Sequence, residues 1–527
     1  MAHSQNDRPA VAKAAHVVQD QAEVLAFLAA KSTHGAGAEV TRVDTHGAAV
    51  FLAGDHAYKV KRAVKFPFMD FSTLEKRRRA CEAEVRVNRA NAPDIYLGVL
   101  PVVRRAGALA LGGEGEIVEW VVQMRRFDER LTCDRVADRG ELTKVLVERV
   151  AAAVVQSQTR AEMRHRVDVV ADMRAVIDGN RSGLDETPDL FGIERVATFT
   201  MRSRSALERV APLLVERSKA GFVRRCHGDL HLRNIVLLNQ TPTLFDALEF
   251  DEALATIDVL YDVAFLLMDL LERDLAVEAS LLFNRYLVSW ADERQLAGLA
   301  ALPLFISVRA AIRAKVIAAG LDHLGDADRQ AEMAAAARYF ALAEAVLEPV
   351  APRLLAIGGL SGTGKSTLAA GLAPGIGCLP GAVHLRSDVE RKRLFAVGEY
   401  DRLPLKAYDP RSSDAVYGIL RHKAELALRA GYSVIVDAVH LHEEEREALR
   451  GLAVRLGIGF AGLWLEAPMH DLVSRVSQRV HDASDANPDI VALQAERGIG
   501  SIDWHRIDAG GDAARVLESA CAVLRQA

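Results

Sequence analysis

The sequence predicts a chain of two folded domains, the first α+β and the second α/β with a parallel sheet. Its 527 residues exceed what one core usually holds, because a domain averages roughly 150 residues. Residues 40–66 alternate apolar and polar positions as antiparallel strands do, further strand segments follow between 95 and 124, and a mostly helical pattern continues to about Leu347. After a proline-bounded break, strand and helix alternate to the end, which indicates parallel strands joined by crossover helices.

The prolines Pro349 and Pro352 set the predicted boundary, because paired prolines stop a helix and the apolar run LLAIGGL follows at once. The predicted division is a leader and short helix at 1–39, a first domain at 40–347, a linker at 348–352 and a second domain at 353–527.

The composition is that of an ordinary globular protein, with 50% apolar and 26% charged residues. A net charge of −5 argues against a nonspecific nucleic-acid binder. The five cysteines are scattered and form no Cys-x-x-Cys pair, so neither a disulfide framework nor a zinc site is indicated. The sequence shows no run of about twenty apolar residues that could span a bilayer. These features predict a cytoplasmic protein without a membrane partner.

Within the first domain, residues 40–66 predict two or three antiparallel strands around a turn at Gly54 and Asp55. Charged and apolar residues at helical spacing predict a helix from Leu74 to Asn91. Further predicted strands are Ile95–Val103, Leu109–Leu111 and Glu116–Met124, followed beyond Thr143 by a helical lobe interrupted only at Ile235–Leu238 and Thr243–Phe245. In the second domain the predicted strands are Arg353–Ile357, Val383–Leu385, Ser433–Val436 and Phe460–Leu465.

The string GLSGTGKS at Gly359–Ser366 follows a predicted strand and precedes the helical pattern STLAAGL, which is the context of a phosphate-binding loop. Glycines let the backbone curl around phosphate beside a helix N-terminus, Lys365 supplies positive charge, and Ser366 offers a hydroxyl to Mg²⁺. Asp437 ends the predicted strand Ser433–Val436 and offers a carboxylate to the same ion. The predicted ATP contacts are Gly359, Ser361, Gly362, Thr363, Gly364, Lys365, Ser366 and Thr367.

Asp388 follows the strand Val383–Leu385 at the carboxyl edge of the sheet and is the candidate base for an acceptor hydroxyl; the alternative is a helix N-cap. Arg391, one helical turn on, could hold an anionic acceptor. Arg475 and Arg479 lie four apart before the polar string VHDASDANPD, which is typical either of a lid that brings arginines to the transferred phosphoryl group or of a solvated helix face. Two histidines after a strand, His440 and His442, are expected at the surface and give no transition-metal site.

Over 353–504 these motifs resemble the small P-loop kinases of metabolites and of polynucleotide 5′-ends, in the adenylate-kinase-like class. The resemblance implies phosphoryl transfer from ATP, and the glycine loop is its most specific part.

In the first domain, the string HGDLHLRN around Asp229 precedes a short strand, and Asp246 ends the string LFD after a turn. Phosphoryl transfer needs a carboxylate near the acceptor hydroxyl and two further oxygen ligands for metal, which Asp229, Asn234 and Asp246 supply. The strings resemble the catalytic and metal-binding loops of aminoglycoside phosphotransferases, choline kinases and other proteins of the protein-kinase-like bilobal fold. The resemblance implies that Asp229 is the base or orients the hydroxyl, and that Asn234 and Asp246 bind Mg²⁺.

The same resemblance implies that Lys59 contacts phosphates and that Glu84 pairs with it, although Lys61 and Glu82 fit the pattern similarly. Asp262 is expected to anchor the catalytic loop. The first domain contains neither a Gly-x-Gly-x-x-Gly loop nor an Asp-Phe-Gly string, which disfavours a protein substrate.

As a whole the chain resembles bacterial fusions of an aminoglycoside phosphotransferase-like domain with a P-loop ATP-binding domain. The resemblance implies two kinase domains that use ATP and Mg²⁺ on small-molecule hydroxyl acceptors. Two alternatives stay open: one domain senses nucleotide and regulates the other, or the second domain phosphorylates polynucleotide 5′-ends. The sequence predicts no oligomeric state.

Overall fold

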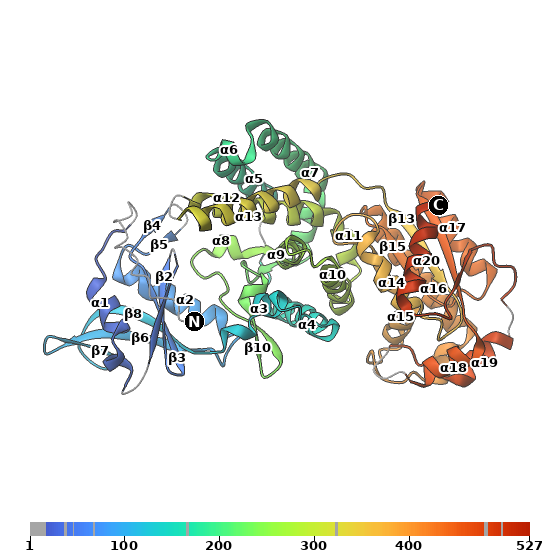
Figure 1. Cartoon of the computed structure of the whole chain (residues 1–527), viewed down its shortest axis with the longest axis horizontal. Helices are drawn as coiled ribbons and strands as arrows, with labels where there is room; N and C mark the ends of the chain where they lie inside the picture. Colours follow the sequence, from blue (N-terminus) through green and yellow to red (C-terminus); the bar gives the residue numbers. More distant parts are fainter. Residues whose placement is uncertain are drawn as a thin grey trace. The chain divides into compact units, whose positions relative to one another are not determined.

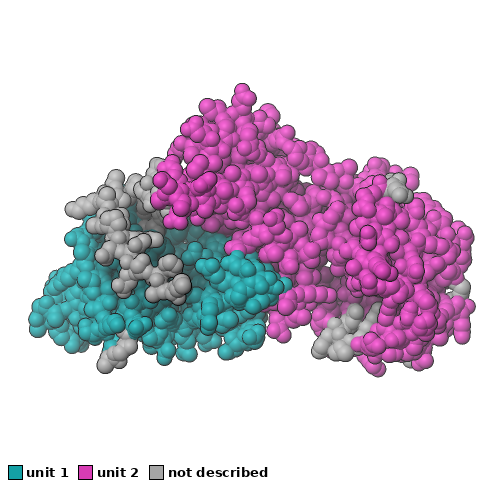
Figure 2. Space-filling view, in the orientation of Figure 1, with its two compact units in different colours: residues 1–142, 156–164, 223–262 teal, residues 143–155, 165–222, 263–527 magenta. Residues whose placement is uncertain are grey.

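The computed structural model describes residues 17–35, 39–45, 47–66, 69–164, 168–321, 325–478, 483–496 and 499–526. The chain forms two compact units, each built from several stretches of sequence (Figure 2). Unit 1 comprises residues 1–142, 156–164 and 223–262, and unit 2 comprises residues 143–155, 165–222 and 263–527. The predicted linker at 348–352 lies inside unit 2, and the predicted division into domains stays a prediction.

Unit 1 is built on a six-stranded antiparallel sheet in the order β1-β2-β3-β8-β6-β7 (Figure 1). Helix α1 (Ala22–Ala29) packs Val24 and Leu28 against one face. Helix α2 (Leu74–Asn88) packs Cys81 and Val85 against the other. The strands are β1 (Val40–Asp44), β2 (Ala48–Ala53), β3 (His56–Lys61), β6 (Tyr96–Arg105), β7 (Ala108–Leu111) and β8 (Glu116–Arg125). The predicted sheet with one long helix is confirmed.

The rest of unit 1 forms short paired strands. Strands β10 (Ile235–Leu238) and β11 (Thr241–Leu244) form a hairpin close to the two predicted segments, and β9 (Val223–Arg225) pairs antiparallel with β12 (Thr256–Asp258). The β9 and β12 strands were missed, because three residues are too few to show alternation. Smaller elements are η1 (Lys31–His34), β4 (Lys65–Phe66), β5 (Met69–Asp70), η2 (Glu129–Leu131), α3 (Cys133–Asp138), η3 (Leu232–Asn234) and α8 (Glu252–Ala255).

The first part of unit 2 is helical, as the sequence predicts. One stretch within the described residues, Arg294–Gly320, is long and apolar enough to cross a bilayer, but most of it is buried inside the fold, as in a core helix. The helices of this part, together with two that extend into unit 1, are α4 (Lys144–Arg160), α5 (Val169–Asp185), α6 (Pro188–Phe191), α7 (Ile193–Lys219), α9 (Val259–Glu272), α10 (Ala276–Trp290), α11 (Arg294–Gly298), η4 (Leu299–Ala301), α12 (Leu302–Gly320) and α13 (Asp326–Ala345).

The second part of unit 2 is a five-stranded parallel sheet in the order β14-β15-β13-β16-β17, which confirms the predicted α/β fold. The strands are β13 (Arg353–Gly358), β14 (Val383–Arg386), β15 (Val434–Asp437), β16 (Gly459–Glu466) and β17 (His505–Asp508). The sequence did not predict β17, whose residues are mostly exposed and carry little apolar pattern.

Helices α14 (Lys365–Leu372) and α20 (Ala513–Gln526) cover one face of this sheet, where Leu368 and Val516 join Ile357 and Ile435 in a buried core. Connecting elements are η6 (Ala373–Gly375), α15 (Ser387–Leu394), η7 (Leu405–Tyr408), α16 (Pro410–Arg429), α17 (Glu443–Leu456), α18 (Met469–Ser477) and α19 (Pro488–Glu496). The carboxyl ends of β13, β14 and β15 therefore share one edge, where ligands bind in such sheets.

Candidate active sites

The phosphate loop joins the end of β13 to the start of α14. Gly359 and Gly362 have φ angles of +137° and +92°, which side chains rarely adopt. At Gly362 a Cβ atom would also lie 2.7 Å from the carbonyl oxygen of Leu472. Helix α14 starts at Lys365, directly after the loop, so the loop lies at a helix N-terminus that favours phosphate.

Ser366 and Asp437 meet beside this loop. The Ser366 hydroxyl donates to Oδ2 of Asp437 at 2.6 Å, and Nε2 of His384 lies 3.2 Å from the same oxygen. Burial opposes ionisation of Asp437, but the His384 hydrogen bond and the positive charges of Arg386 and Lys365 hold its pKa well below the usual range. The site therefore keeps a buried carboxylate next to a hydroxyl, and hard oxygen atoms of this kind are what Mg²⁺ prefers.

Lys365 and the loop amides already have partners inside the protein. Nζ of Lys365 donates to the carbonyl oxygens of Gly359 and Leu360 at 2.9 and 3.0 Å. The backbone N–H of Ser361 donates to the side-chain oxygen of Gln494 in α19 at 2.9 Å. Gln494 thus occupies a loop amide of the kind that receives phosphate oxygens.

A cavity of about 550 Å³ opens at this edge of the sheet. It brings together residues that lie more than 100 positions apart in the sequence. The predicted residues that line it are Ser361, Gly362, Gly364, Lys365, Ser366, Thr367, Asp388, Arg391, Asp437 and Arg475. The phosphate loop, the candidate base and the candidate metal ligands therefore share one space.

Asp388 is the second residue of α15, and the N-cap position is held by Arg386. The alternative interpretation of Asp388 as an N-cap is therefore wrong, and its half-buried carboxylate lines the cavity. Arg391 is 7% exposed, and its Nη1 donates to the carbonyl oxygen of Ala407 while its guanidinium lies 5.1 Å from the ring centre of Tyr408. Part of its hydrogen-bonding capacity is thus taken up by the protein.

Of the two predicted lid arginines, Arg475 lies on α18 and donates from Nη1 to the carbonyl oxygen of Ala509 at 2.9 Å. Arg479 lies outside the described residues. Beyond it, Asp485 accepts hydrogen bonds from Nζ of Lys392 at 2.7 Å and from the N–H of Leu403 at 2.8 Å. Asp485 is therefore held against the C-terminal end of α15 and the residues that follow it.

His440 is fully buried, which corrects the expectation that it lies at the surface. Its ring packs between Tyr417 and Trp504, with ring centres 5.5 and 5.3 Å away. Burial lowers its pKa from 6.5 to about 3. The chain pattern could not show this, because a polar residue after a strand is usually exposed. His442 is exposed, as expected.

The burial of His440 predicts that unit 2 loses stability in mild acid. The unfolded chain binds a proton at His440 below pH 6.5 while the folded chain does not until about pH 3, so stability falls as pH falls through this window. We expect the unfolding free energy to drop by about 2 kcal/mol between pH 7 and pH 5 from this residue alone. His440→Asn should remove that part of the drop in urea unfolding followed by tryptophan fluorescence. An unchanged pH dependence in the variant would contradict the assignment.

In unit 1, a network of opposite charges joins β3, α2 and the segment after β11. Nζ of Lys59 lies 2.8 Å from Glu84 and 2.7 Å from Asp246, and Lys61 pairs with Glu84 and Glu249. Burial alone would lower the pKa of Lys59, but the carboxylates of Asp246, Glu84 and Glu249 raise it well above its ordinary value. Both lysines therefore meet Glu84, and Lys59 is the one that reaches Asp246.

Glu82 does not take part in this network. Its side chain is 47% exposed and pairs with Arg78, whereas the Glu84 side chain is fully buried. Positions 82 and 84 of α2 differ by about 200° around the helix, so only one of them can face the sheet. Of the two glutamates that could pair with Lys59, it is Glu84 that does. The phosphate contact of Lys59 stays a prediction.

Because of this network, the same Glu→Gln substitution at positions 84 and 82 of α2 should change the stability of unit 1 by very different amounts. Glu84→Gln should destabilise unit 1 by about 3 kcal/mol, because it leaves two buried ammonium groups without a shared carboxylate. Glu82→Gln should change stability by less than about 0.5 kcal/mol, since it alters an exposed ion pair. Urea unfolding of the two full-length variants, followed by circular dichroism, checks the difference. Similar losses in both would contradict the buried role of Glu84.

The predicted catalytic loop is held in shape by its own side chains. Nδ2 of Asn234 donates to the backbone oxygen and to Oδ2 of Asp229 at 2.9 and 3.0 Å, which leaves the amide oxygen of Asn234 as the atom that could ligate metal. The N–H of Gly228 donates to Asp262 at 2.9 Å, which confirms Asp262 as the anchor of the loop. The Asp229 side chain is 41% exposed and so is open to an acceptor.

The loop is tied to the Asp246 segment by two further contacts. The N–H of Phe245 donates to the Asn234 carbonyl oxygen at 3.0 Å, and the His227 ring lies 2.9 Å from the carbonyl oxygen of Phe245. Asp246 itself has φ = +57°, a strained conformation that Asp tolerates better than most residues. The candidate base Asp229 and the two candidate metal ligands, Asn234 and Asp246, thus lie on one continuous hydrogen-bonded structure.

Sequence reasoning missed several side chains of the two sites: Glu249, His384, Arg386 and Gln494. Glu249 follows Asp246 by three residues and His384 lies within the predicted strand Val383–Leu385, so position along the chain offered a weak signal for these two. Gln494 lies over 130 residues from the amide that it contacts, and nothing in the sequence connects them.

The chain matches a family model described as an AAA domain over residues 354–497. It is 30% identical over 502 residues to uncharacterized proteins of Mycobacterium tuberculosis (strain H37Rv) and Mycobacterium bovis, a match that covers 92% of this chain and 95% of each relative.

Among solved structures, it is similar to a choline/ethanolamine kinase family protein from Mesorhizobium loti, at 17% identity and a TM-score of 0.37, over 62% of this chain and 94% of that one. A gluconokinase from Sinorhizobium meliloti is similar at 19% identity and a TM-score of 0.26, over 33% of this chain and 93% of that one.

Proposed function

This chain belongs to the family of the uncharacterized mycobacterial proteins that it matches over 502 residues, and we propose that it is an ATP-dependent phosphotransferase with two kinase-type sites acting on small-molecule hydroxyl acceptors in the cytoplasm. One observation carries the proposal. The phosphate loop, the Ser366 and Asp437 pair and the Asp388 carboxylate line a single cavity of about 550 Å³. A site that only senses nucleotide has no need of a carboxylate such as Asp388 beside the phosphates.

In the proposed reaction, the acceptor oxygen forms a bond to the terminal phosphorus of ATP while the bond from that phosphorus to the bridging oxygen breaks, which releases ADP. The hydroxyl proton passes to Asp388 in unit 2 or to Asp229 in unit 1. Lys365 and Arg475 face the cavity and neutralise charge on the transferred group. The acceptor must fit beside the nucleotide, which supports a small molecule over a polynucleotide end.

The oxygen atoms at both sites suit magnesium. Ser366 and Asp437 would hold it in unit 2, and Asn234 and Asp246 in unit 1. When bound, the ion would withdraw negative charge from the phosphate groups. Among the described residues no three His, Cys, Asp or Glu side chains gather as a metal cluster, and a Mg²⁺ ion that shares its ligands with phosphates and water does not need one.

The experiment is ATP consumption by wild type, Asp229→Asn and Lys365→Met with Mg²⁺, against sugars, aminoglycosides, nucleosides and 5′-hydroxyl oligonucleotides. Turnover stimulated by one acceptor and lost in only one variant assigns that acceptor to one site. Stimulation by oligonucleotides alone would favour the polynucleotide alternative. ATP binding without stimulation by any acceptor would favour the nucleotide-sensing alternative and count against the proposal.

A further inference from the structure

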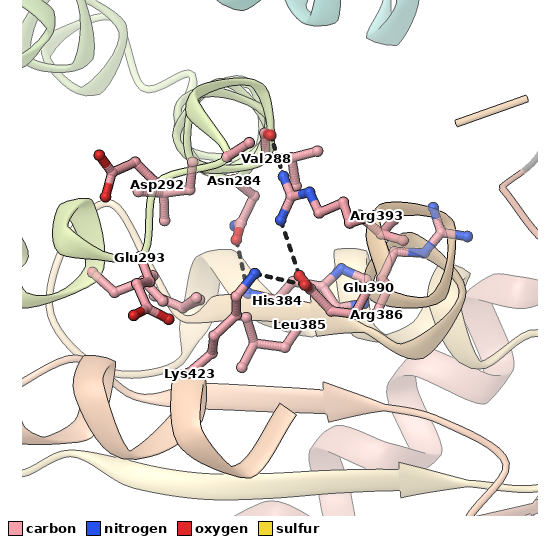
Figure 3. Close-up of a pocket in the computed structure, with 15 residues that line it drawn as sticks. Asn284, Val288, Asp292, Glu293, His384, Leu385, Arg386, Glu390, Arg393 and Lys423 are labelled. Carbon is pink, nitrogen blue, oxygen red and sulfur yellow. Dashed lines mark hydrogen bonds and ion pairs between the residues drawn. The ribbon is translucent and has the colours of Figure 1, made fainter. Parts of the chain in front are cut away.

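Helix α10 belongs to the predicted helical lobe of the first domain, yet within unit 2 it packs along the open edge of the parallel sheet that carries the phosphate loop (Figure 3). Phe283 of α10 lies with its ring centre 5.6 Å from that of Tyr432, which precedes β15. Arg285 forms an ion pair of 2.6 Å with Glu399, and the guanidinium of Arg393 donates to the carbonyl oxygen of Val288. The helix therefore contacts the α/β part through several independent groups.

Asn284 makes the contact that reaches the strand itself. Strand β14 is the edge of the sheet, so within the described part of the chain no strand pairs with one side of its backbone. The Asn284 side chain makes the hydrogen bonds that a neighbouring strand would make. Its Oδ1 accepts from the N–H of His384 at 2.7 Å, and its Nδ2 donates to the carbonyl oxygen of Ala382 at 3.1 Å. One carboxamide thus satisfies two backbone groups that a sixth strand would otherwise pair with.

His384, whose backbone N–H is bonded to Asn284, also contacts the phosphate site through its side chain. From the same residue, Nε2 of His384 lies 3.2 Å from Oδ2 of Asp437, the oxygen that also accepts from Ser366. The backbone of His384 is fixed by Asn284 and its ring meets the carboxylate of Asp437. Asn284, on a helix of the first predicted domain, is therefore connected through His384 to Asp437, the proposed metal ligand.

Helix α15, which carries Asp388, is held on the same side. Glu390 is 4% exposed and accepts from Arg393 at 3.0 Å and from Lys423 of α16 at 2.6 Å, and Arg393 in turn donates to α10 as described above (Figure 3). Strand β14 and helix α15, which flank the acceptor side of the cavity, thus both contact α10.

Resting on the function proposed above, we infer that Asn284 is a positioning residue of the phosphate-loop site, which acts through His384 to orient Asp437 for magnesium. Groups of this kind, which orient a ligand without touching the metal, typically change metal affinity by about 10- to 100-fold when removed. The inference makes the helical lobe a working part of the second kinase site rather than a neighbour joined by a linker.

The test uses the full chain carrying Asp246→Asn, which removes a proposed metal ligand of the first site. Calorimetry measures the Mg²⁺ concentration that gives half of the magnesium-dependent gain in ATP affinity. Asn284→Ala should raise this concentration by about tenfold and leave ATP binding in EDTA unchanged. Arg285→Gln, which removes another contact of α10 with the α/β part, should change it by less than twofold. Asn284→Asp, which keeps the acceptor for the His384 amide, should fall between the two.

His384→Asn decides whether the effect passes through His384. It should raise the Mg²⁺ requirement by itself, and adding Asn284→Ala to it should cause no further rise beyond twofold, because residues in one chain of contacts are not additive. Equal effects of Asn284→Ala and Arg285→Gln, no effect of either, or full additivity with His384→Asn would overturn the inference while leaving the proposed function intact. Failure of the Asp246→Asn protein to bind ATP at all would instead count against the proposed function itself and with it this inference.

Discussion

Replacing Lys365 with methionine is expected to abolish phosphotransfer at the phosphate loop while the first site stays active. The substitution keeps the length of the side chain and removes the positive charge that faces the cavity and contacts the loop carbonyls. We expect a loss of at least about 10³-fold in kcat/KM, or about 4 kcal/mol, which is the scale for removing one group that stabilises charge in the transition state. Turnover with an acceptor of the second site measures it.

Lys406→Met is the matched control for this change. Lys406 lies in η7 of the same part of unit 2, and its side chain is exposed. Its substitution should leave kcat/KM within about twofold, since surface changes away from a site have small effects. Comparable losses in the two variants, or an active Lys365→Met protein, would show that the loop does not carry the reaction.

Asp229→Asn is expected to slow turnover at the first site by about 10² to 10⁴-fold, the range for loss of a general base. Nucleotide binding should change by less than about threefold, because the proposed metal ligands and Lys59 are kept. The fold should also be kept, since the Asp229 side chain is 41% exposed and the asparagine oxygen can still accept from Asn234. Turnover and ATP binding are measured in the Lys365→Met background, so that only the first site contributes.

The control for Asp229 is the same change at the exposed Asp94, which lies in unit 1 before β6. Asp94→Asn should leave both turnover and binding unchanged. If Asp229→Asn weakens nucleotide binding as much as turnover, Asp229 acts in binding, and its proposed role as base is wrong.

The fold was predictable from the sequence where patterns are long and local. The alternating segments became the antiparallel sheet of unit 1, and the string at Gly359–Ser366 lies between strand and helix as expected, because a loop that presents amides to phosphate has strict local demands on glycine. The β17 strand was missed because its exposed residues carry no apolar pattern.

Contacts between distant segments were not predictable in the same way. Lys59 and Lys61 lie on one face of β3 and both meet Glu84, so only the fold distinguishes the one that reaches Asp246. Asn284 has no motif of its own, and its importance comes entirely from lying opposite the open edge of a strand some 100 residues later. The reactive residues of a site can thus be found in short sequence motifs, whereas the residues that support them are known only once the chain has packed.

The proposed pairing of two kinase sites in one chain rests on both units binding nucleotide. The most direct measurement is the number of MgATP molecules bound per chain by calorimetry, for wild type, Lys365→Met and Asp246→Asn. If each unit binds one nucleotide, wild type binds two molecules and each variant binds one. A single molecule in wild type, lost in one variant and unaffected in the other, would contradict the pairing of two kinase sites and show that one unit does not bind MgATP.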